Sequence, residues 1–257
     1  MRQFRHKTLL LFTCLVGLLA GCQTTGVNPD TGNHKKRAEI HYQLGVDALG
    51  KHNLPKAFDE LMEAQKMAPE RADILDALGY AWRLRGDLSK ADDYYRQAIR
   101  HHPESATYNN YGSLLLQMRK PAEAEKYFRK ALADPKYMHP DIAYINLGDA
   151  LLAQDRFNEA IAAYHQATRL NPQQQIAQLH EAKAYLSYNR PAYAKAIYES
   201  ILRVYPGNLP AMKGMLSLLE KQDELDTARR YLKRFHDKTS VPLDRAWAQE
   251  QLKRLDQ

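Results

Sequence analysis

Ten histidines make this chain a candidate for metal binding or acid–base catalysis. Two histidine ligands on one helix would lie three or four positions apart, so that both side chains share a face. His101 and His102 are adjacent instead, and they stand just before Pro103, where a helix is predicted to end. A histidine there interacts favourably with the negative end of the helix dipole. The pattern predicts no metal ion and no cofactor.

Motifs for other chemistry are also missing. The sequence contains no Gly-x-Ser-x-Gly nucleophile elbow, no glycine-rich phosphate loop and no His-Glu-x-x-His zinc motif. Neighbouring carboxylates such as Asp92 and Asp93 are typical of the solvated face of a helix. We therefore expect a protein that is not an enzyme.

Cys22 is the residue for which the sequence indicates a covalent modification. The basic residues Arg2, Arg5 and Lys7 precede an apolar run that is too short to span a bilayer of about 30 Å. Residues 19–22, Leu-Ala-Gly-Cys, resemble a bacterial lipobox. That resemblance implies that residues 1–21 are a signal peptide and that Cys22 becomes the acylated, palmitate-bearing first residue. An ordinary signal peptide with a chance cysteine, or a short membrane anchor, are the alternatives.

The residue after the cysteine predicts the destination. In lipoproteins of this kind an Asp at that position retains the protein in the inner membrane, and Gln23 stands there instead. The resemblance thus implies an outer-membrane protein, lipid-anchored and facing the periplasm. Several acyl chains, at about 0.8 kcal/mol per buried methylene, make such an anchor effectively permanent.

Composition limits what the rest of the chain can be. Removing the three basic residues of the signal lowers the formal net charge from +7 to +4, and this small excess is spread along the chain. Nucleic-acid binding is therefore not expected, because it requires Lys and Arg concentrated on one face. The only other cysteine, Cys14, lies in the signal, so packing without disulfides must stabilise the body.

A repeat of about 34 residues organises the body. A glycine on a helical pattern is followed by an alanine, a large apolar residue, a second alanine and a closing proline. The glycines are Gly45, Gly79, Gly112 and Gly148, and the large residues are Leu61, Tyr95, Phe128 and Tyr164. This pattern resembles the tetratricopeptide repeat. It predicts an all-α solenoid of about six helix-turn-helix units, in which the glycines let paired helices approach closely.

The expected boundaries follow from this pattern. Residues 22–37 are polar and predicted to be a flexible tether, residues 38–238 hold six repeats, and residues 239–257 hold a capping helix. The last two repeats are irregular, because Ala182 and Leu216 replace the glycine. The capping helix is expected to bury an apolar face that includes Leu243, Ala246 and Trp247.

The first helix of each repeat is expected to line the concave side of the solenoid. The inward positions that we select as a partner-binding groove are Tyr42, Val46, Leu49, Tyr80, Asn110 and Asn146. The three residues of the first repeat either pack against the tether or the next repeat, or form an apolar groove for an amphipathic segment. In the second case the two asparagines hydrogen-bond the backbone of that segment.

One junction between repeats is longer than the others. Residues 133–141, ADPKYMHPD, contain two extra residues, which form either a longer turn or a contact loop. Together with the lipobox, residues 108–112 (YNNYG) and residues 122–128 (AEAEKYF), this junction resembles the type IV pilus biogenesis and stability lipoproteins, the PilF/PilW pilotin family.

The family resemblance implies a function. It implies an outer-membrane pilotin that binds the secretin subunit of the type IV pilus machinery and promotes its localisation and multimerisation. A periplasmic tetratricopeptide scaffold that recruits cell-wall enzymes or other envelope assembly factors is the alternative.

Overall fold

The structure is a computed structural model that describes residues 29–256, and this part of the chain is entirely helical apart from its turns. The helices are α1 Pro29–Gly50, α2 Leu54–Met67, α3 Ala72–Arg85, α4 Leu88–His101, α5 Ser105–Gln117, α6 Pro121–Leu132, α7 Pro140–Leu152, α8 Phe157–Leu170, α9 Gln175–Ser187, α10 Pro191–Val204, α11 Leu209–Lys221, α12 Leu225–Lys238 and α13 Pro242–Leu255. Between positions 29 and 256, no helix has both the length and the apolar character needed to cross a membrane.

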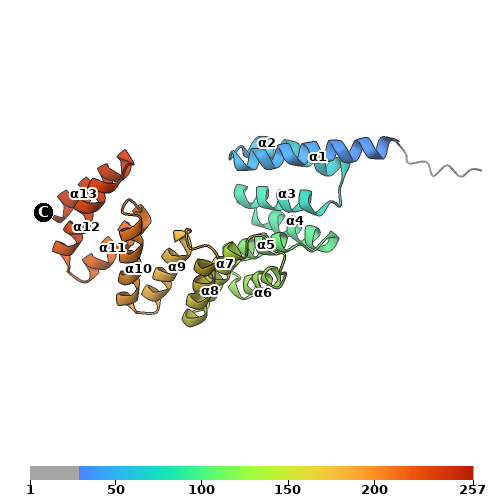
Figure 1. The fold of residues 1–257 in the computed structure, drawn as a ribbon. Helices are drawn as coiled ribbons and strands as arrows, with labels where there is room; N and C mark the ends of the chain where they lie inside the picture. The colour runs from blue at the N-terminus through green and yellow to red at the C-terminus, as the bar shows by residue number, and fades with distance from the viewer. Residues whose placement is uncertain (1–28, 257) are drawn as a thin grey trace, which may run out of the picture.

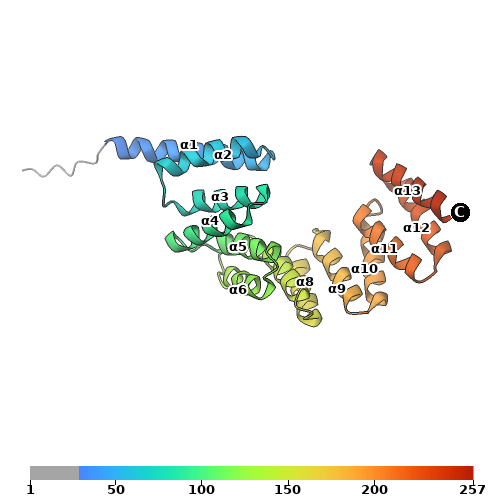
Figure 2. The same cartoon turned by 180° about the vertical axis from the view of Figure 1, so that it is seen from behind.

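Twelve of these helices form six antiparallel pairs that follow one another along an arc, with α1 and α13 at its two ends (Figures 1 and 2). Each helix contacts the next one in the chain, and the first helices of successive pairs also meet, from α1 and α3 through to α7 and α9. In Figure 1 α5 and α7 lie toward the inside of the arc and α6 and α8 lie outside, and Figure 2 again shows α5 inside with α6 and α8 outside. The predicted six-unit solenoid is confirmed.

The repeated glycines of the first four pairs make room for the large residue of the partner helix. A Cβ atom added at Gly45 would lie 2.6 Å from Leu61 Cγ, and one added at Gly148 would lie 2.4 Å from Tyr164 Cε1. Real Cβ atoms essentially never come so close to another atom. The close approach of paired helices, predicted from sequence, therefore depends on the glycine and the side chain directly opposite it.

In the sixth pair the glycine that makes room for a large ring lies at a different position. Leu216 occupies the position of the repeat glycine, as the sequence pattern indicates, and the structure shows that it is buried. However, Gly214 of α11 lies against the ring of Tyr198 in the preceding pair, where an added Cβ would be 2.4 Å from Tyr198 Cζ. The glycine contact thus joins two successive pairs here, and the sequence pattern did not predict it.

The turn within each pair contains one residue in the left-handed region. Five of these residues are not glycines, and the sixth is Gly86 with φ of +90°. The five are His52, Arg119, Asp155, Asn189 and Asp223. Since a left-handed residue with a side chain costs roughly 1–2 kcal/mol, the packing of the paired helices must impose this conformation on the turn.

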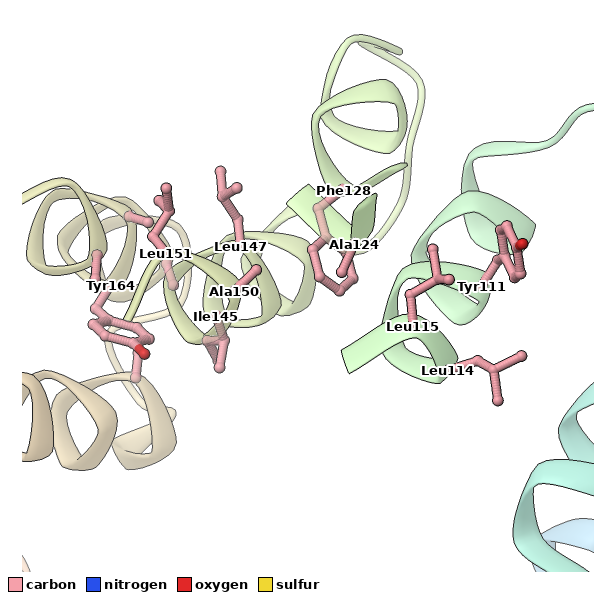
Figure 3. Close-up of a cluster of buried hydrophobic side chains, with 14 of the residues drawn as sticks. Tyr111, Leu114, Leu115, Ala124, Phe128, Ile145, Leu147, Ala150, Leu151 and Tyr164 are labelled. Atoms are coloured by element: carbon pink, nitrogen blue, oxygen red, sulfur yellow. The ribbon is translucent and has the colours of Figure 1, made fainter. Parts of the chain in front are cut away.

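The hydrophobic core runs along the array as a series of clusters between helices. Figure 3 shows the central cluster, where Tyr111, Leu114 and Leu115 of α5 lie near Phe128 of α6, followed by residues of α7 and Tyr164 of α8. Burial in such an array is local, because each pair packs only on its neighbours.

Helix α13 covers the end of the last pair. Its Ala248 is fully buried, and its Trp247 ring packs edge-on against Phe235 of α12, with ring centroids 5.9 Å apart. Two residues assigned to the packed face from sequence do not belong to it, since Leu243 is 82% exposed and Ala246 is also exposed. Both residues lie in the first part of α13, which begins at Pro242, before its buried residue Ala248.

The N-terminal boundary differs from the prediction. Residues 29–37, expected to belong to a flexible tether, form the first part of α1. Proline suits the first position of a helix, and the run of Lys and Arg at positions 35–37 consists of good helix formers. Glu39, in the next turn, forms an ion pair with Arg71. The predicted signal peptide, Cys22 and residues 22–28 lie outside the described residues.

Candidate partner-binding groove

An open groove of about 430 Å³ lies where α1, α3 and α5 come together, and we call it the N-terminal groove. Five of the six residues selected from sequence line it. They are Tyr42, Val46, Leu49, Tyr80 and Asn110. The first three are spaced three and four positions apart, so α1 presents all of them on one face. Gly50, His52, Asp76 and Ala77 complete the lining.

The apolar wall of the groove divides into an exposed part and a buried part. Val46 is 39% exposed, whereas Leu49 is only 8% exposed and belongs to the core cluster with Leu61 and Leu78. Of the two interpretations left open by the sequence, packing against the next repeat therefore describes Leu49. Val46 is available to another molecule.

Two tyrosines flank the groove, and the guanidinium group of an arginine lies over the ring of each. The Arg71 guanidinium lies 5.1 Å from the ring centroid of Tyr42, and the Arg83 guanidinium lies 5.0 Å from that of Tyr80. Burial raises the pKa of Tyr42 to about 12, so its hydroxyl stays protonated at neutral pH. Each ring is thus packed against an arginine at one end of α3.

Asp76 places a carboxylate among these apolar and aromatic groups. Asn110 Nδ2 donates to it, at 3.0 Å from Oδ2 and 3.3 Å from Oδ1. Burial raises the pKa of Asp76 to about 6, and hydrogen bonds from Thr107 and Asn110 oppose part of that rise. Asp76 lies four positions before Tyr80 on α3, so the two side chains share one face of that helix. Its burial could not be read from the sequence, because it depends on the approach of α5.

Asn146 does not belong to the N-terminal groove, contrary to its selection from sequence. It lies on α7, and its Nδ2 donates to Asn109 Oδ1 at 2.9 Å and to Ser113 Oγ at 3.4 Å. The amide N–H groups of Asn110 and Asn146 both bind neighbouring helices. Hydrogen bonds from these two side chains to a partner's backbone, one of the two interpretations of the sequence, stay a prediction.

These contacts continue as a polar ladder between the inner helices. Asp149 of α7 accepts a hydrogen bond from Tyr164 at 2.7 Å, and the same oxygen lies 2.7 Å from His180 Nδ1 of α9. The ladder thus links α3 to α5, α5 to α7 and α7 to α9. These hydrogen bonds between polar residues at inward positions fix the distance between successive repeats.

The long junction between α6 and α7 lies at the inner side of the array. Tyr137 is half-buried, and burial raises its pKa to about 12, with smaller effects of Asp141 and Asp76. Met138 is 81% exposed. The tyrosine thus anchors the junction, whereas the methionine projects from it. Within residues 29–256, no three His, Cys, Asp or Glu side chains gather closely enough to hold a metal ion.

Comparison with known proteins identifies the family. Tetratricopeptide-repeat family models match residues 85–138, 112–174 and 151–219, which together span more than half of the chain. The chain is a tetratricopeptide-repeat protein. The helix pairs, the inner and outer layers and the glycine contacts described above are the features of this family in three dimensions.

Its relatives include proteins of pilus assembly. The type IV pilus assembly protein PilF of Pseudomonas aeruginosa is 27% identical over 230 residues, which cover 88% of this chain and 90% of PilF. The solved structure of P. aeruginosa PilF has a TM-score of 0.68 at 22% identity, over 85% of this chain and 99% of that one. The crystal structure of PilW, a type IV pilus biogenesis factor, has a TM-score of 0.72 at 24% identity, over 78% and 93%. These two structures share the fold of this tetratricopeptide array.

Proposed function

We propose that this tetratricopeptide-repeat protein is an outer-membrane pilotin, which binds the secretin subunit of the type IV pilus machinery and promotes its localisation and multimerisation. The similarity to PilF, a type IV pilus assembly protein, supports this role because it extends over nearly the whole length of both chains. The lipobox-like sequence ending at Cys22 supports an acyl anchor in the outer membrane, with the array in the periplasm.

The N-terminal groove is the observation that carries the proposal. It combines an exposed apolar residue, Val46, with two tyrosine rings packed against arginines. A groove lined by rigid apolar and aromatic groups suits an amphipathic segment of another protein, which buries its apolar face there.

The proposed mechanism involves binding and no chemical step. A permanent anchor holds the array at the membrane, and the groove brings secretin subunits to the same surface. Confining subunits to one membrane raises their local concentration and thereby favours multimers without any new contact between them. The array acts as an adaptor with no enzymatic activity.

Deleting the gene tests the proposal. We expect fewer secretin multimers in the envelope and fewer surface pili, and restoring the gene should restore both. Co-purification from solubilised envelopes should recover the secretin subunit. Normal multimers and pili in the deletion strain would contradict the proposal, and recovery of cell-wall enzymes without secretin would favour the alternative scaffold.

A further inference from the structure

Asp76 is the only acidic residue that lines the N-terminal groove as the structure describes it. Its hydrogen-bond partners, Thr107 and Asn110, are both neutral. Among residues 29–256, no Lys or Arg nitrogen lies within 4.0 Å of its carboxylate. Arg71, the N-cap of α3, and Arg83, in the last turn of α3, are engaged elsewhere. Arg71 pairs with Glu39 and Asp73, while Arg83 stacks on Tyr80.

The charged side chains that act most strongly on Asp76 do not balance its negative charge. The two side chains whose charges act most strongly on it, Glu104 and Asp73, are both acidic. A partly buried carboxylate without a cation is costly, and burying it further under a bound apolar segment would increase that cost. An apolar segment alone is therefore a poor occupant of this groove, even though the walls are apolar.

We propose that the segment bound in the N-terminal groove carries a Lys or Arg, placed between apolar residues, whose cationic group pairs with Asp76. This inference rests on the proposed function for the identity of the partner and adds the chemistry of its bound segment. The apolar residues would cover Val46, while the cation would reach the carboxylate beside Tyr80.

A photo-crosslinking residue at position 46 of the full chain, expressed in its own cells, tests the inference. We expect crosslinks to a secretin segment that contains a Lys or Arg flanked by apolar residues. Asp76→Asn should lower the crosslinked yield at least about tenfold, because the cation loses its partner. Asp93→Asn is the matched control, since Asp93 is an exposed carboxylate on the outer helix α4 and should leave the yield unchanged.

A charge exchange completes the test. Asp76→Lys should abolish the crosslink, and replacing the partner's Lys or Arg by Asp should restore it. Thermal melting of each variant checks that the array is folded. Equal crosslinking to secretin by wild type and Asp76→Asn would overturn the inference while leaving the proposed function intact. An Asp76-dependent crosslink to a basic segment of another protein would support the inference and contradict the proposed function. No crosslink at all would overturn both.

Discussion

Gly148 of α7 and Tyr164 of α8 touch so closely that the hydrogen on the glycine Cα takes the place of a side chain. We expect Gly148→Ala to destabilise the protein by about 1–3 kcal/mol, because the buried ring has nowhere to move. The intrinsic preference of a helix for alanine, worth about 1 kcal/mol, offsets only part of that loss. Chemical denaturation followed by circular dichroism measures the change.

Gly50 provides the control for this substitution. It is the last residue of α1, and an added Cβ there would meet nothing within 4 Å. Gly50→Ala should therefore be neutral or slightly stabilising. Equal stability of the two variants would show that the glycine–ring contact does not determine how closely the helices pack.

Substitution of each of the two aliphatic residues of the groove should affect stability and partner binding differently. Leu49→Ala removes a core side chain and should cost about 2–5 kcal/mol of stability. Val46→Ala, at an exposed position, should change stability by less than about 0.5 kcal/mol while weakening partner binding. Thermal melting and secretin co-purification of both variants give the two readouts. A large loss of stability in Val46→Ala would assign that residue to the core.

Asp76 should make stability depend on pH in a defined direction. Its pKa is raised from 3.8 to about 6 in the fold, so the folded chain holds this proton more tightly than the unfolded chain does. The stabilisation is fully present below pH 3.8 and is lost as pH rises through about 6. The titratable groups coupled to this site include Asp73, Glu104 and the phenols of Tyr42, Tyr95 and Tyr137.

Comparison with Asp76→Asn isolates this effect from all other carboxylates. We expect the variant to melt at a higher temperature than the wild type at pH 7.5, and the difference to shrink as pH falls from 7 to 4. Differential scanning calorimetry across this range measures it. A difference that grows on acidification would mean that the carboxylate is stabilised in its charged form.

Cys22→Ser tests the anchor. The acyl chains are expected to attach through the thiol, so the variant should move from the membrane fraction to the soluble fraction. Fractionation of cells followed by immunodetection measures this shift, with secretin multimers as a second readout. A serine variant that stays in the membrane, or a wild-type chain without acyl groups by mass spectrometry, would contradict the anchor.

The fold could be predicted because the residue pattern that encodes each helix pair is local and recurs along the chain. Gly79, Gly112 and Gly148 recur at one place in each unit, opposite large side chains, so their periodicity directly encodes the helix pairs. The start of α1 at Pro29 escaped prediction, because polar composition concealed good helix formers. Gly214 escaped because its contact joins two pairs and falls outside the repeat pattern.

The groove could be predicted only in part. Helical spacing was enough to place Tyr42, Val46 and Leu49 on one face. Burial of Leu49, however, depends on how α3 packs, and the donor groups of Asn110 and Asn146 bind side chains of neighbouring helices. These contacts join residues more than thirty positions apart. Their geometry is set by the curvature of the array, which no single repeat contains.

The central claim is that the N-terminal groove binds the secretin subunit. Val46→Asp places a charge at the exposed centre of the apolar wall without disturbing the core, and Met62→Asp, at an exposed position of α2 that does not line the groove, is its control. The decisive measurement is the amount of secretin multimer in the outer membrane of cells that express each variant at equal level. We predict few multimers with Val46→Asp and wild-type amounts with Met62→Asp. Wild-type amounts with Val46→Asp would contradict the account.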